Sequence, residues 1–526
     1  MLIGNSLCRT RPPDLLACTA ATDTRKSMRT FSKSKLMALR QCPKRLWLEV
    51  HRPDLREDSA ATEASFQVGF QVGDIAQRIY DPEGLGALID VQSEGFDRAF
   101  ERSAELLHST QPIFEAGFSA GGALAFADAM LPEQRNGKQV WRMVEVKSST
   151  SVKDYHRDDV AVQAFVAQSA GVPLVAIAVA HIDNSWVYPG DNDYRGLLKE
   201  NDLTAEAFAR TEEVKGWIAQ AQAIVGEPCQ PVIETGAQCD QPFECGFYTY
   251  CSRDEPKPEC PVYWLPRFSS AKVQELVAQG VDDLRNVPDA LLNDKQKRVK
   301  EHTQSNTAFF DAAGAATDLA AYGLPAYFLD FETIQFAVPI WKGTRPYQQI
   351  TFQFSLHTLS ASGQLEQTAF LDLSGNDPSE AFARALIAEC GQDGPVYVYH
   401  AGFEKARISE LAERYPALSA PLLAINERVV DLLPIARERY YHPSQQGSWS
   451  IKKVLPAVVP ELRYDALDGV QDGGMAMEAF LEGIHPDTSA ERKAEIEQQL
   501  LAYCKLDTYA MVRLWQVFAG RTDLRL

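Results

Sequence analysis

The chain has 526 residues, too many for one hydrophobic core, so we expect two to three domains. Its composition is that of a soluble globular protein, and no apolar run approaches the length of a membrane span. The net charge of −19 argues against a general nucleic-acid binder, which is normally basic, but leaves room for a nuclease whose metal ligands are acidic.

The first 28 residues carry scattered arginines without a continuous apolar segment, so they do not read as a secretory signal and we expect them to be disordered. Ten cysteines in a chain without such a signal indicate reduced thiols or metal ligands, and we expect a cytoplasmic protein. Residues 31–52 open with a serine cap signal and continue as a basic helix. Cys42 precedes Pro43, which favours an extended backbone there. The basic residues of this segment offer a local strip for nucleic acid: Lys33, Lys35, Arg40, Lys44, Arg45 and Arg52.

Three strands are expected next, at residues 112–118, 123–131 and 141–147. They carry Glu115, Asp128 and the pair Glu145 and Lys147, which share one strand face. A helix beginning near residue 158 carries Gln163, and a further apolar strand covers 174–179. Two acids bind a divalent ion, and a lysine stabilises developing negative charge or orients the attacking water. The alternative is an ion pair on a surface strand.

An Asp, a Glu-x-Lys strand and a helix with Gln resemble the PD-(D/E)xK nuclease core of the RecB and CRISPR-associated exonuclease type. The resemblance implies metal ligation by Asp128 and Glu145, aided by Glu115 and the Val146 carbonyl, with Lys147 and Gln163 as catalytic residues. That family often has a metal-binding His on an upstream helix, where this chain offers Asp74.

Cys239, Cys245 and Cys251 follow, each separated from the next by five residues, which is wider than the usual zinc knuckle. Iron–sulfur clusters accept wider spacing and need four thiolates, and Cys42 would be the fourth. This arrangement resembles the iron-staple of the same exonuclease group and implies an iron–sulfur cluster of the 4Fe–4S type. Zinc is the alternative metal, and three packed thiols in an aromatic loop are the alternative without metal. Cys229 and Cys260 flank the set as substitutes.

Residues 262–324 are expected to form a helical connector before a second domain at 325–526. In the apolar run that begins this domain, Asp330 and Glu332 are two apart, hence side by side on one strand face. A second buried strand breaks at Gly402, and Glu404 lies in the first turn of the helix that follows. Tyr503 and Asp507 are four apart on a late helix, so they share a face. Oxygen ligands of this kind suit Mg²⁺ or Mn²⁺, whereas the alternative is a strand with two solvated acids.

This order of D-x-E, F-E after a strand and Y-x-x-x-D resembles the DEDDy branch of the ribonuclease H-like 3′–5′ exonucleases over about residues 325–520. The resemblance implies that Asp330, Glu332, Glu404 and Asp507 hold two metal ions and that Tyr503 positions the attacking water. The chain departs from that pattern at two positions, because Glu404 stands where Asp is usual and His400 stands where Asn is common.

Residues 441–456 form a turn-rich loop followed by a short helix. Lys452 and Lys453 suit phosphate contacts and Trp449 or Tyr441 suits base stacking, while a packed connection is the equal alternative. Asp431 is either a helper near the site or a helix cap, and Cys504 is expected on a different helix face from Tyr503 and Asp507.

Together the two halves resemble an uncharacterised bacterial family of predicted RecB-type nucleases with a C-terminal domain of unknown function. The fold class implied is α/β: a restriction-endonuclease-like core with a metal-cluster subdomain at 29–261, the connector, and a ribonuclease H-like mixed sheet. The function implied is a metal-dependent nuclease, with DNA ahead of RNA as substrate and no membrane partner; protein partners are open. The alternatives are a degenerate nucleic-acid-binding or assembly protein, or an RNA-directed 3′–5′ exonuclease.

Overall fold

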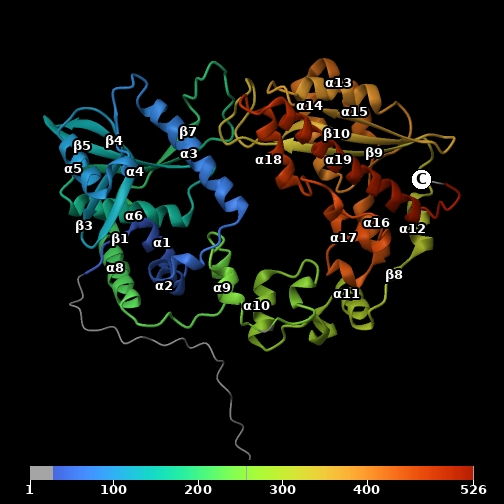
Figure 1. The fold of residues 1–526 in the computed structure, drawn as a ribbon, viewed down its shortest axis with the longest axis horizontal. Coiled ribbons are helices and arrows are strands. Elements are labelled where there is room, and N and C mark those ends of the chain that lie inside the picture. Colours follow the sequence, from blue (N-terminus) through green and yellow to red (C-terminus); the bar gives the residue numbers. More distant parts are fainter. Residues whose placement is uncertain (1–27, 256, 525–526) are drawn as a thin grey trace, which may run out of the picture. The chain divides into compact units, whose positions relative to one another are not determined.

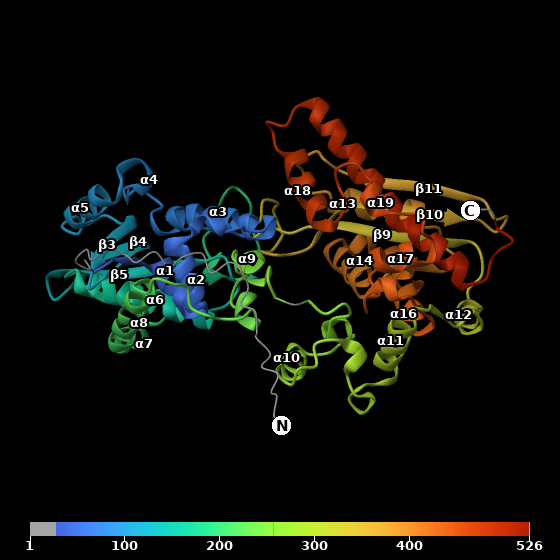
Figure 2. The same cartoon turned by 60° about the horizontal axis from the view of Figure 1, so that its bottom comes forward.

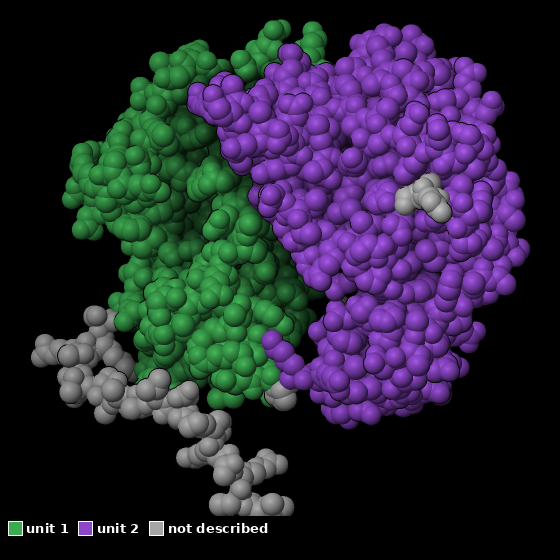
Figure 3. Space-filling model, turned by 45° about the vertical axis from the view of Figure 1, so that its right-hand side comes forward, with its two compact units in different colours: residues 1–255, 337–346 green, residues 256–336, 347–526 purple. Residues whose placement is uncertain are grey.

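The computed structural model describes residues 28–255 and 257–524, so the segment expected to be disordered lies almost wholly outside the described residues. The chain divides into two compact units, distinguished by colour in Figure 3. Unit 1 comprises residues 1–255 and 337–346, and unit 2 comprises 256–336 and 347–526. Residues 262–324, expected to be a connector, therefore belong to the same unit as the C-terminal sheet.

Unit 1 is built on a seven-stranded mixed sheet with the order β2-β3-β4-β5-β6-β7, and β1 pairs with β4 outside that path (Figure 1). β3, β4 and β5 are antiparallel, whereas β5 and β6 are parallel. The strands are β1 Phe31–Ser32, β2 Ala87–Leu88, β3 Ile113–Ala120, β4 Ala123–Arg135, β5 Lys138–Lys147, β6 Leu174–Ile182 and β7 Leu198–Asp202.

Helices pack around this sheet. They are α1 Lys33–Gln41, α2 Pro43–His51, α3 Ala60–Tyr80, α4 Val91–Glu94, α5 Phe96–Leu106, α6 Asp154–Ser169, α7 Thr204–Ala209, α8 Thr211–Val225 and α9 Tyr248–Ser252. The expected basic helix is split at Cys42, whose backbone is extended (φ −159°, ψ 123°) because Pro43 follows it. α6, with Val162 and Val166 completely buried, packs on the sheet within the main core of unit 1.

Residues 337–346 lie between two strands of unit 2 in the sequence but belong to unit 1. Thr344 accepts a hydrogen bond from the backbone N–H of Tyr188, and Gly343 donates one to the carbonyl of Tyr188. The Tyr194 hydroxyl donates to the Pro339 carbonyl. The sequence of these ten residues contains no local pattern that predicted that the chain would pass back into unit 1 here.

Unit 2 contains a five-stranded sheet with the order β11-β10-β9-β12-β13, of which β9, β10 and β11 are labelled in Figure 2. β9 pairs antiparallel with β10 and parallel with β12, so the sheet is mixed, as the sequence predicted. Its strands are β9 Ala326–Ile334, β10 Ile350–Leu359, β11 Leu365–Leu371, β12 Val396–Val398 and β13 Val429–Asp431, and a separate pair joins β8 Phe309–Phe310 to β14 Tyr440–Tyr441.

Unit 2 also contains helices, some of which pack on the two faces of this sheet. They are α10 Ser270–Ala278, α11 Asp294–Ser305, α12 Ala312–Leu319, α13 Ser379–Glu389, α14 Gly402–Arg414, α15 Ser419–Glu427, α16 Leu432–Arg439, α17 Ile451–Val458, α18 Gly473–Ile484 and α19 Ala490–Phe518. Among the helices of residues 28–255 and 257–524, none combines the length and apolar character needed to traverse a bilayer.

The central strand β9 alternates between two environments because successive side chains point to opposite faces. Phe331 packs edge-on against Phe382 of α13, with ring centroids 5.0 Å apart. Phe328, on the opposite face, packs against Trp515 of α19 at 5.8 Å. The long helix α19 runs across β9 and β10 (Figure 2). The face that carries Asp330 and Glu332 is therefore the face that α19 covers.

Candidate metal centres

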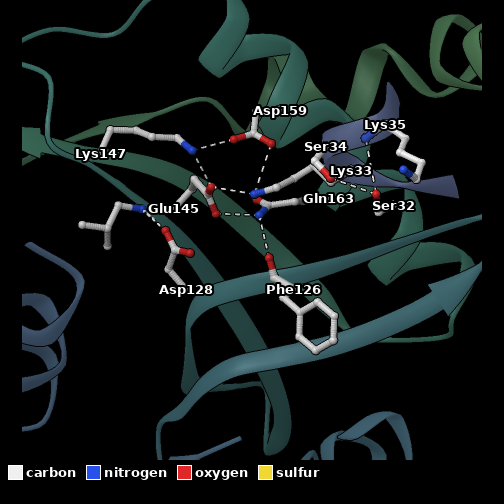
Figure 4. A network of polar contacts seen from close by, with 11 residues as sticks. Ser32, Lys33, Ser34, Lys35, Phe126, Asp128, Glu145, Lys147, Asp159 and Gln163 are labelled. Carbon is white, nitrogen blue, oxygen red and sulfur yellow. Dashed lines mark hydrogen bonds and ion pairs between the residues drawn. The ribbon is translucent and has the colours of Figure 1, made fainter. Parts of the chain in front are cut away.

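The first acidic cluster lies on the face of the unit 1 sheet that α6 covers. Glu145 and Lys147 are two apart on β5 and share that face. On β4, Asp128 accepts a 2.6 Å hydrogen bond from the backbone N–H of Val146, which holds its carboxylate beside β5 (Figure 4). The sheet thus brings Asp128, Glu145 and Lys147 to one place.

Gln163 reaches this cluster from α6. Its amide nitrogen donates to Glu145 Oε2 at 2.5 Å and to the carbonyl of Phe126 at 2.9 Å (Figure 4). Glu145 is only 1% exposed, and this contact fixes the orientation of its carboxylate. Gln163 therefore acts on Glu145 in this structure as a positioning residue.

Two further members of the cluster are Lys33, which was expected in a basic strip for nucleic acid, and Asp159, which was not predicted. Lys33 Nζ lies 2.7 Å from Glu145 Oε1 and 3.2 Å from Asp159 Oδ1. Lys147 Nζ lies 2.6 Å from the same Glu145 oxygen and 2.6 Å from Asp159 Oδ2. Ammonium groups and carboxylates thus alternate in a four-membered network (Figure 4).

The position of Lys33 is set by contacts between segments that are distant in the sequence. Phe31 and Ser32 pair with Ala123 and Leu124 of β4, and this parallel pairing places the next residue beside the sheet. Asp159 lies four residues before Gln163 on α6, so the helix presents both on one face. A helical-wheel comparison with Gln163 would have identified Asp159 as a candidate.

The pairing of β3 with β4 is interrupted beside the acidic cluster. Phe114 pairs with Ala129 and Ala116 pairs with Ala127, but Glu115 and Asp128 between them do not pair. Glu115 has a left-handed backbone (φ 56°), which a non-glycine residue adopts only where its surroundings impose it. The irregularity thus coincides with two of the acidic residues.

Negative charges outnumber positive ones in this cluster. Burial, and then the charge of Glu145, raises the pKa of Glu115 to about 7 and that of Asp128 well above its usual value. Burial also opposes ionisation of Glu145, but the ammonium groups of Lys147 and Lys33 outweigh it and lower the pKa. With Asp159, four carboxylates face two ammonium groups, and the excess of two charges is what one divalent cation neutralises. The donor set fits a metal ion.

The four predicted cluster cysteines also come together in unit 1. Cys42, between α1 and α2, lines a common pocket with Cys239, Cys245 and Cys251. All four carry free thiols, and the backbone N–H of Cys245 donates to the Cys239 carbonyl at 2.7 Å. Apolar side chains, Leu48 and Phe247 among them, pack around this group.

This donor set fits a soft metal group, because four thiols within an apolar pocket match the ligands of a 4Fe–4S cluster or of a four-cysteine zinc site. Burial raises the pKa of the thiols of Cys239, Cys245 and Cys251, so loading with metal must displace their protons. Cys260, considered as a substitute, belongs to unit 2 and does not line this pocket.

We expect Cys42→Ser to lose the bound metal, because a cluster site needs its fourth thiolate. The measurement is iron, sulfide and zinc content of anaerobically purified full-length protein. Cys260→Ser, which changes a buried cysteine outside the pocket, serves as the control. An unchanged metal content in Cys42→Ser would remove that residue from the ligand set, and a colourless parent with one zinc per chain would favour the zinc alternative.

The second acidic cluster lies in unit 2, where α19 crosses β9 and where α14 begins after β12, the strand that pairs with β9. Asp330 and Glu332 come from β9, Glu404 from the first turn of α14, and Asp507 from the middle of α19. Glu332, Glu404 and Asp507 are 9%, 3% and 6% exposed. None of these four carboxylates forms an ion pair within residues 28–255 and 257–524. The cluster is a buried group of acids that lacks a paired cation from the described chain.

The electrostatics of this cluster follow from burial and mutual repulsion. Burial, and then the charge of Asp507, raises the pKa of Asp330 well above its usual value and that of Glu332 to about 8. Burial raises the pKa of Glu404 to about 8 and that of Asp507 to about 6. Such carboxylates hold protons near neutral pH unless a cation replaces them.

Two tyrosines stand at the Asp507 side of the cluster. Tyr464 donates a 2.6 Å hydrogen bond to Asp507 Oδ1, and its ring lies 6.3 Å from that of Tyr503. Hydrogen bonding by both hydroxyls opposes the rise in the pKa of Asp507. Tyr503 was predicted from its spacing to Asp507, whereas Tyr464 lies 43 residues upstream and no local pattern indicated it.

Cys504 also belongs to this cluster, which corrects the expectation that it faces elsewhere. Its Sγ lies 3.8 Å from Asp330 Oδ2, and donor atoms of Asp330, Glu332 and Cys504 lie within 4.8 Å of one another. Cys504 and Asp507 are three apart on α19, and residues at that spacing are neighbours on a helix. The expectation took into account the four-residue spacing between Tyr503 and Asp507 but not the three-residue spacing between Cys504 and Asp507.

Glu404 is held in place by the turn between β12 and α14. Asp431 accepts hydrogen bonds from the backbone N–H groups of His400 and Ala401, and it also caps α16 through the N–H of Leu433. His400 has a left-handed backbone (φ 85°), and these contacts stabilise it. Asp431 is thus both a cap and a support of the site. Glu404 Oε2 is buried and has no hydrogen-bond partner in the described part of the chain.

The predicted nucleic-acid contacts at 441–456 are corrected in part. Trp449 is 5% exposed and donates its indole N–H to the Tyr440 carbonyl at 2.7 Å, and Tyr441 is completely buried. Neither ring is open to stack on a base, so the packed connection is the interpretation that fits. Lys453 is exposed and donates to Gln446 at 3.2 Å.

Lys452 has a different position from the one expected. Its Nζ lies 5.1 Å from the ring of Tyr503 and 5.4 Å from that of Tyr464, and its charge opposes the rise in the pKa of Glu332 that burial and Asp507 cause. It also lines a surface groove with Pro456, Pro460, Arg463, Tyr464 and Asp465. Lys452 therefore connects this groove with the acidic cluster.

We expect Glu332→Gln to stabilise the metal-free protein at pH 8 but not at pH 5. The folded-state pKa of Glu332, about 8, exceeds its ordinary value of 4.5, so the folded chain holds the proton more tightly and stability falls as pH rises between these values. Each pKa unit corresponds to about 1.4 kcal/mol. Thermal melting with a chelator measures the effect, and saturating Mn²⁺ should reverse it by stabilising the parent alone. Equal melting of both proteins at pH 8 would contradict the repulsion inferred for this cluster.

The fold and the two acidic clusters define a mixed α/β protein with a candidate metal centre in each unit. A family model described as a domain of unknown function, DUF2779, matches residues 327–450. The match contains Asp330, Glu332 and Glu404 and ends before Tyr503 and Asp507. No curated protein matches the chain.

Proposed function

We propose that the chain is a metal-dependent nuclease that hydrolyses phosphodiester bonds, with DNA as the first substrate to test. The observation that carries the proposal is the adjacency of Asp330 and Glu332 on β9 beneath α19, with the charges of Asp507 on α19 and Glu404 on α14 acting on Asp330. The four negative charges of these carboxylates equal the positive charge of two divalent cations of the Mg²⁺ or Mn²⁺ class. Burying ionised carboxylates is costly, and bound cations would offset that cost.

The strand order supports the resemblance of residues 325–520 to ribonuclease H-like exonucleases. In chain order, β9, β10 and β11 form an antiparallel meander, and β12 and β13 add in parallel on the other side of β9. The acids on β9 then lie on the central strand, beside the helix that carries Tyr503 and Asp507. The fold-level likeness alone does not assign an activity.

This carboxylate set would hold two divalent cations, which would supply the charge needed to activate water and to stabilise the leaving oxygen in phosphodiester hydrolysis. The chain's own residues would orient the reactants. The Tyr503 hydroxyl, beside Asp507, would position the water, and the Tyr464 hydroxyl holds Asp507 Oδ1 in place. Lys452 offers a positive charge to a phosphate entering from the groove.

In unit 1, the same proposal assigns metal ligation to Asp128 and Glu145, with Glu115 nearby. Lys147 would stabilise charge developing on the phosphate, and Gln163 holds the carboxylate of Glu145. The four cysteines would hold an iron–sulfur cluster that ties α1 to the segment around α9.

A second candidate function is nucleic-acid binding or assembly without cleavage. It is favoured by the network in unit 1, where Lys33 and Lys147 neutralise Glu145 and Asp159 without a metal. Because two of the four carboxylates in that centre are already paired, its electrostatic need of a cation is reduced.

The deciding experiment is a metal-scanned cleavage assay on full-length protein. Single- and double-stranded DNA, labelled at either end, and matched RNA are incubated with Mg²⁺, Mn²⁺ or chelator. We expect stepwise release of nucleotides from single-stranded DNA 3′ ends that requires metal. Binding without cleavage across all ions would contradict the nuclease and favour the second candidate, and preferential digestion of RNA would reassign the substrate.

A further inference from the structure

Cys504 places one sulfur donor inside an otherwise oxygen-lined cluster. Its thiol is completely buried on α19, and Sγ lies 3.8 Å from both the carboxylate Oδ2 and the backbone carbonyl oxygen of Asp330. Together with Glu332, these groups offer three donor atoms within 4.8 Å of one another, close enough for one ion to contact all three.

A second observation points to the same position. Glu332, a member of this three-donor group, is only 9% exposed, and no described residue forms an ion pair with its carboxylate or donates a hydrogen bond to it. A buried carboxylate oxygen without a donor is costly unless a proton or a cation meets it. The thiol of Cys504 and the carboxylate of Glu332 therefore lie beside one potential cation position.

We propose that the unit 2 centre binds a thiophilic divalent cation of the zinc class through Cys504 Sγ together with Asp330 and Glu332. Oxygen-only sites suit Mg²⁺ and Mn²⁺, whereas a thiolate raises affinity for Zn²⁺, Cd²⁺ and Co²⁺. On binding, the sulfur–hydrogen bond breaks, a sulfur–metal bond forms, and the proton passes to the buffer. The inference rests on the proposed metal centre but not on its hydrolytic activity.

The same residues imply a competition between metals. A zinc-class ion that uses Asp330 and Glu332 occupies carboxylates that the proposed Mg²⁺ or Mn²⁺ chemistry needs. We therefore expect such ions to inhibit Mn²⁺-dependent hydrolysis in the parent and to inhibit Cys504→Ser more weakly. Weaker inhibition of Cys504→Ser would therefore distinguish a metal-binding thiol from a thiol that only packs in the core.

Cys390 supplies a matched comparison within the same unit. It is also completely buried, but its Sγ accepts a weak 3.8 Å contact from the Arg428 guanidinium and is not part of the three-donor group. Replacing Cys390 by Ser changes a buried thiol to a hydroxyl without touching the acidic cluster.

The test is a titration of the full-length, anaerobically purified chain with Cd²⁺, followed by cadmium–thiolate charge-transfer absorption and proton release. The parent, Cys504→Ser and Cys390→Ser all retain the cysteines of unit 1, so those thiols contribute equally. We expect Cys504→Ser to lose the absorption and the proton of one bound Cd²⁺, and Cys390→Ser to match the parent. Superimposable titrations of the parent and Cys504→Ser would overturn the proposal.

If Cys504→Ser does not fold, a second variant that keeps the thiol tests the proposal. Asp330→Asn removes an oxygen donor, and we expect it to weaken Cd²⁺ binding at this site by about tenfold or more. Undiminished binding in Asp330→Asn would overturn the proposal. A normal cadmium signal in a parent that cleaves no nucleic acid would leave the inference standing and reject the proposed function alone.

Discussion

Asp330→Asn is expected to abolish metal-dependent hydrolysis by unit 2 while the protein remains folded. Asp330 lies on the central strand, and its carboxylate belongs to the group of donor atoms that it forms with Glu332 and Cys504. An amide keeps the shape but removes the charge that a cation requires. A loss of about 4 kcal/mol of transition-state stabilisation corresponds to a rate reduction of about a thousandfold.

The measurement is release of nucleotides from a single-stranded 3′ end, made in chains that also carry Asp128→Asn so that unit 1 does not contribute. Asp372→Asn is the control, because Asp372 only accepts a hydrogen bond from the backbone of Ser374 and lies outside the cluster. Binding of the same oligonucleotide, measured by anisotropy, should be retained in chelator. Cleavage by Asp330→Asn at the rate of the control would reject the assignment of this centre.

Glu145→Ala is expected to destabilise unit 1 and to remove its metal binding. Lys33 and Lys147 both contact the same oxygen of Glu145, so its removal leaves two ammonium groups sharing Asp159. Removing one partner of a buried ion pair costs about 3–5 kcal/mol because the remaining charge is left without compensation. Urea-induced unfolding of the full chain, followed by tryptophan fluorescence, measures this loss.

The controls for this experiment separate charge from simple truncation. Glu133→Ala removes a partly exposed carboxylate of β4 that pairs with Arg135 and Arg142, and such surface pairs contribute about 1 kcal/mol or less. The double variant Glu145→Ala with Lys33→Met should be more stable than Glu145→Ala alone, because one uncompensated charge is gone. A Glu145→Ala protein as stable as Glu133→Ala would show that both lysines turn to solvent at little cost.

Local patterns predicted the secondary structure around both centres well. The strands expected at 112–118, 123–131 and 141–147 correspond to β3, β4 and β5, each with slightly different ends. The break at Cys42 followed from Pro43, and the placement of Glu404 in a first helical turn followed from the strand and glycine before it. These are effects of neighbours along the chain.

Contacts between distant segments were the ones that sequence reasoning missed. Lys33 reaches Glu145 across 112 residues, and Tyr464 reaches Asp507 across 43. Trp449 looked suited to base stacking, but it is buried and its N–H is used by Tyr440. Whether a side chain faces solvent or a core depends on what packs over it, which residue type alone does not reveal.

The sequence by itself determined which side chains share a face. Asp330 with Glu332, Glu145 with Lys147, and Tyr503 with Asp507 are set by the two-residue period of a strand and the 3.6-residue period of a helix. Only the tertiary structure decided which faces meet: α19 over β9, and the start of α1 beside β4. The reason is that backbone geometry acts over a few residues, whereas burial and charge pairing act between segments that only the folded chain brings together.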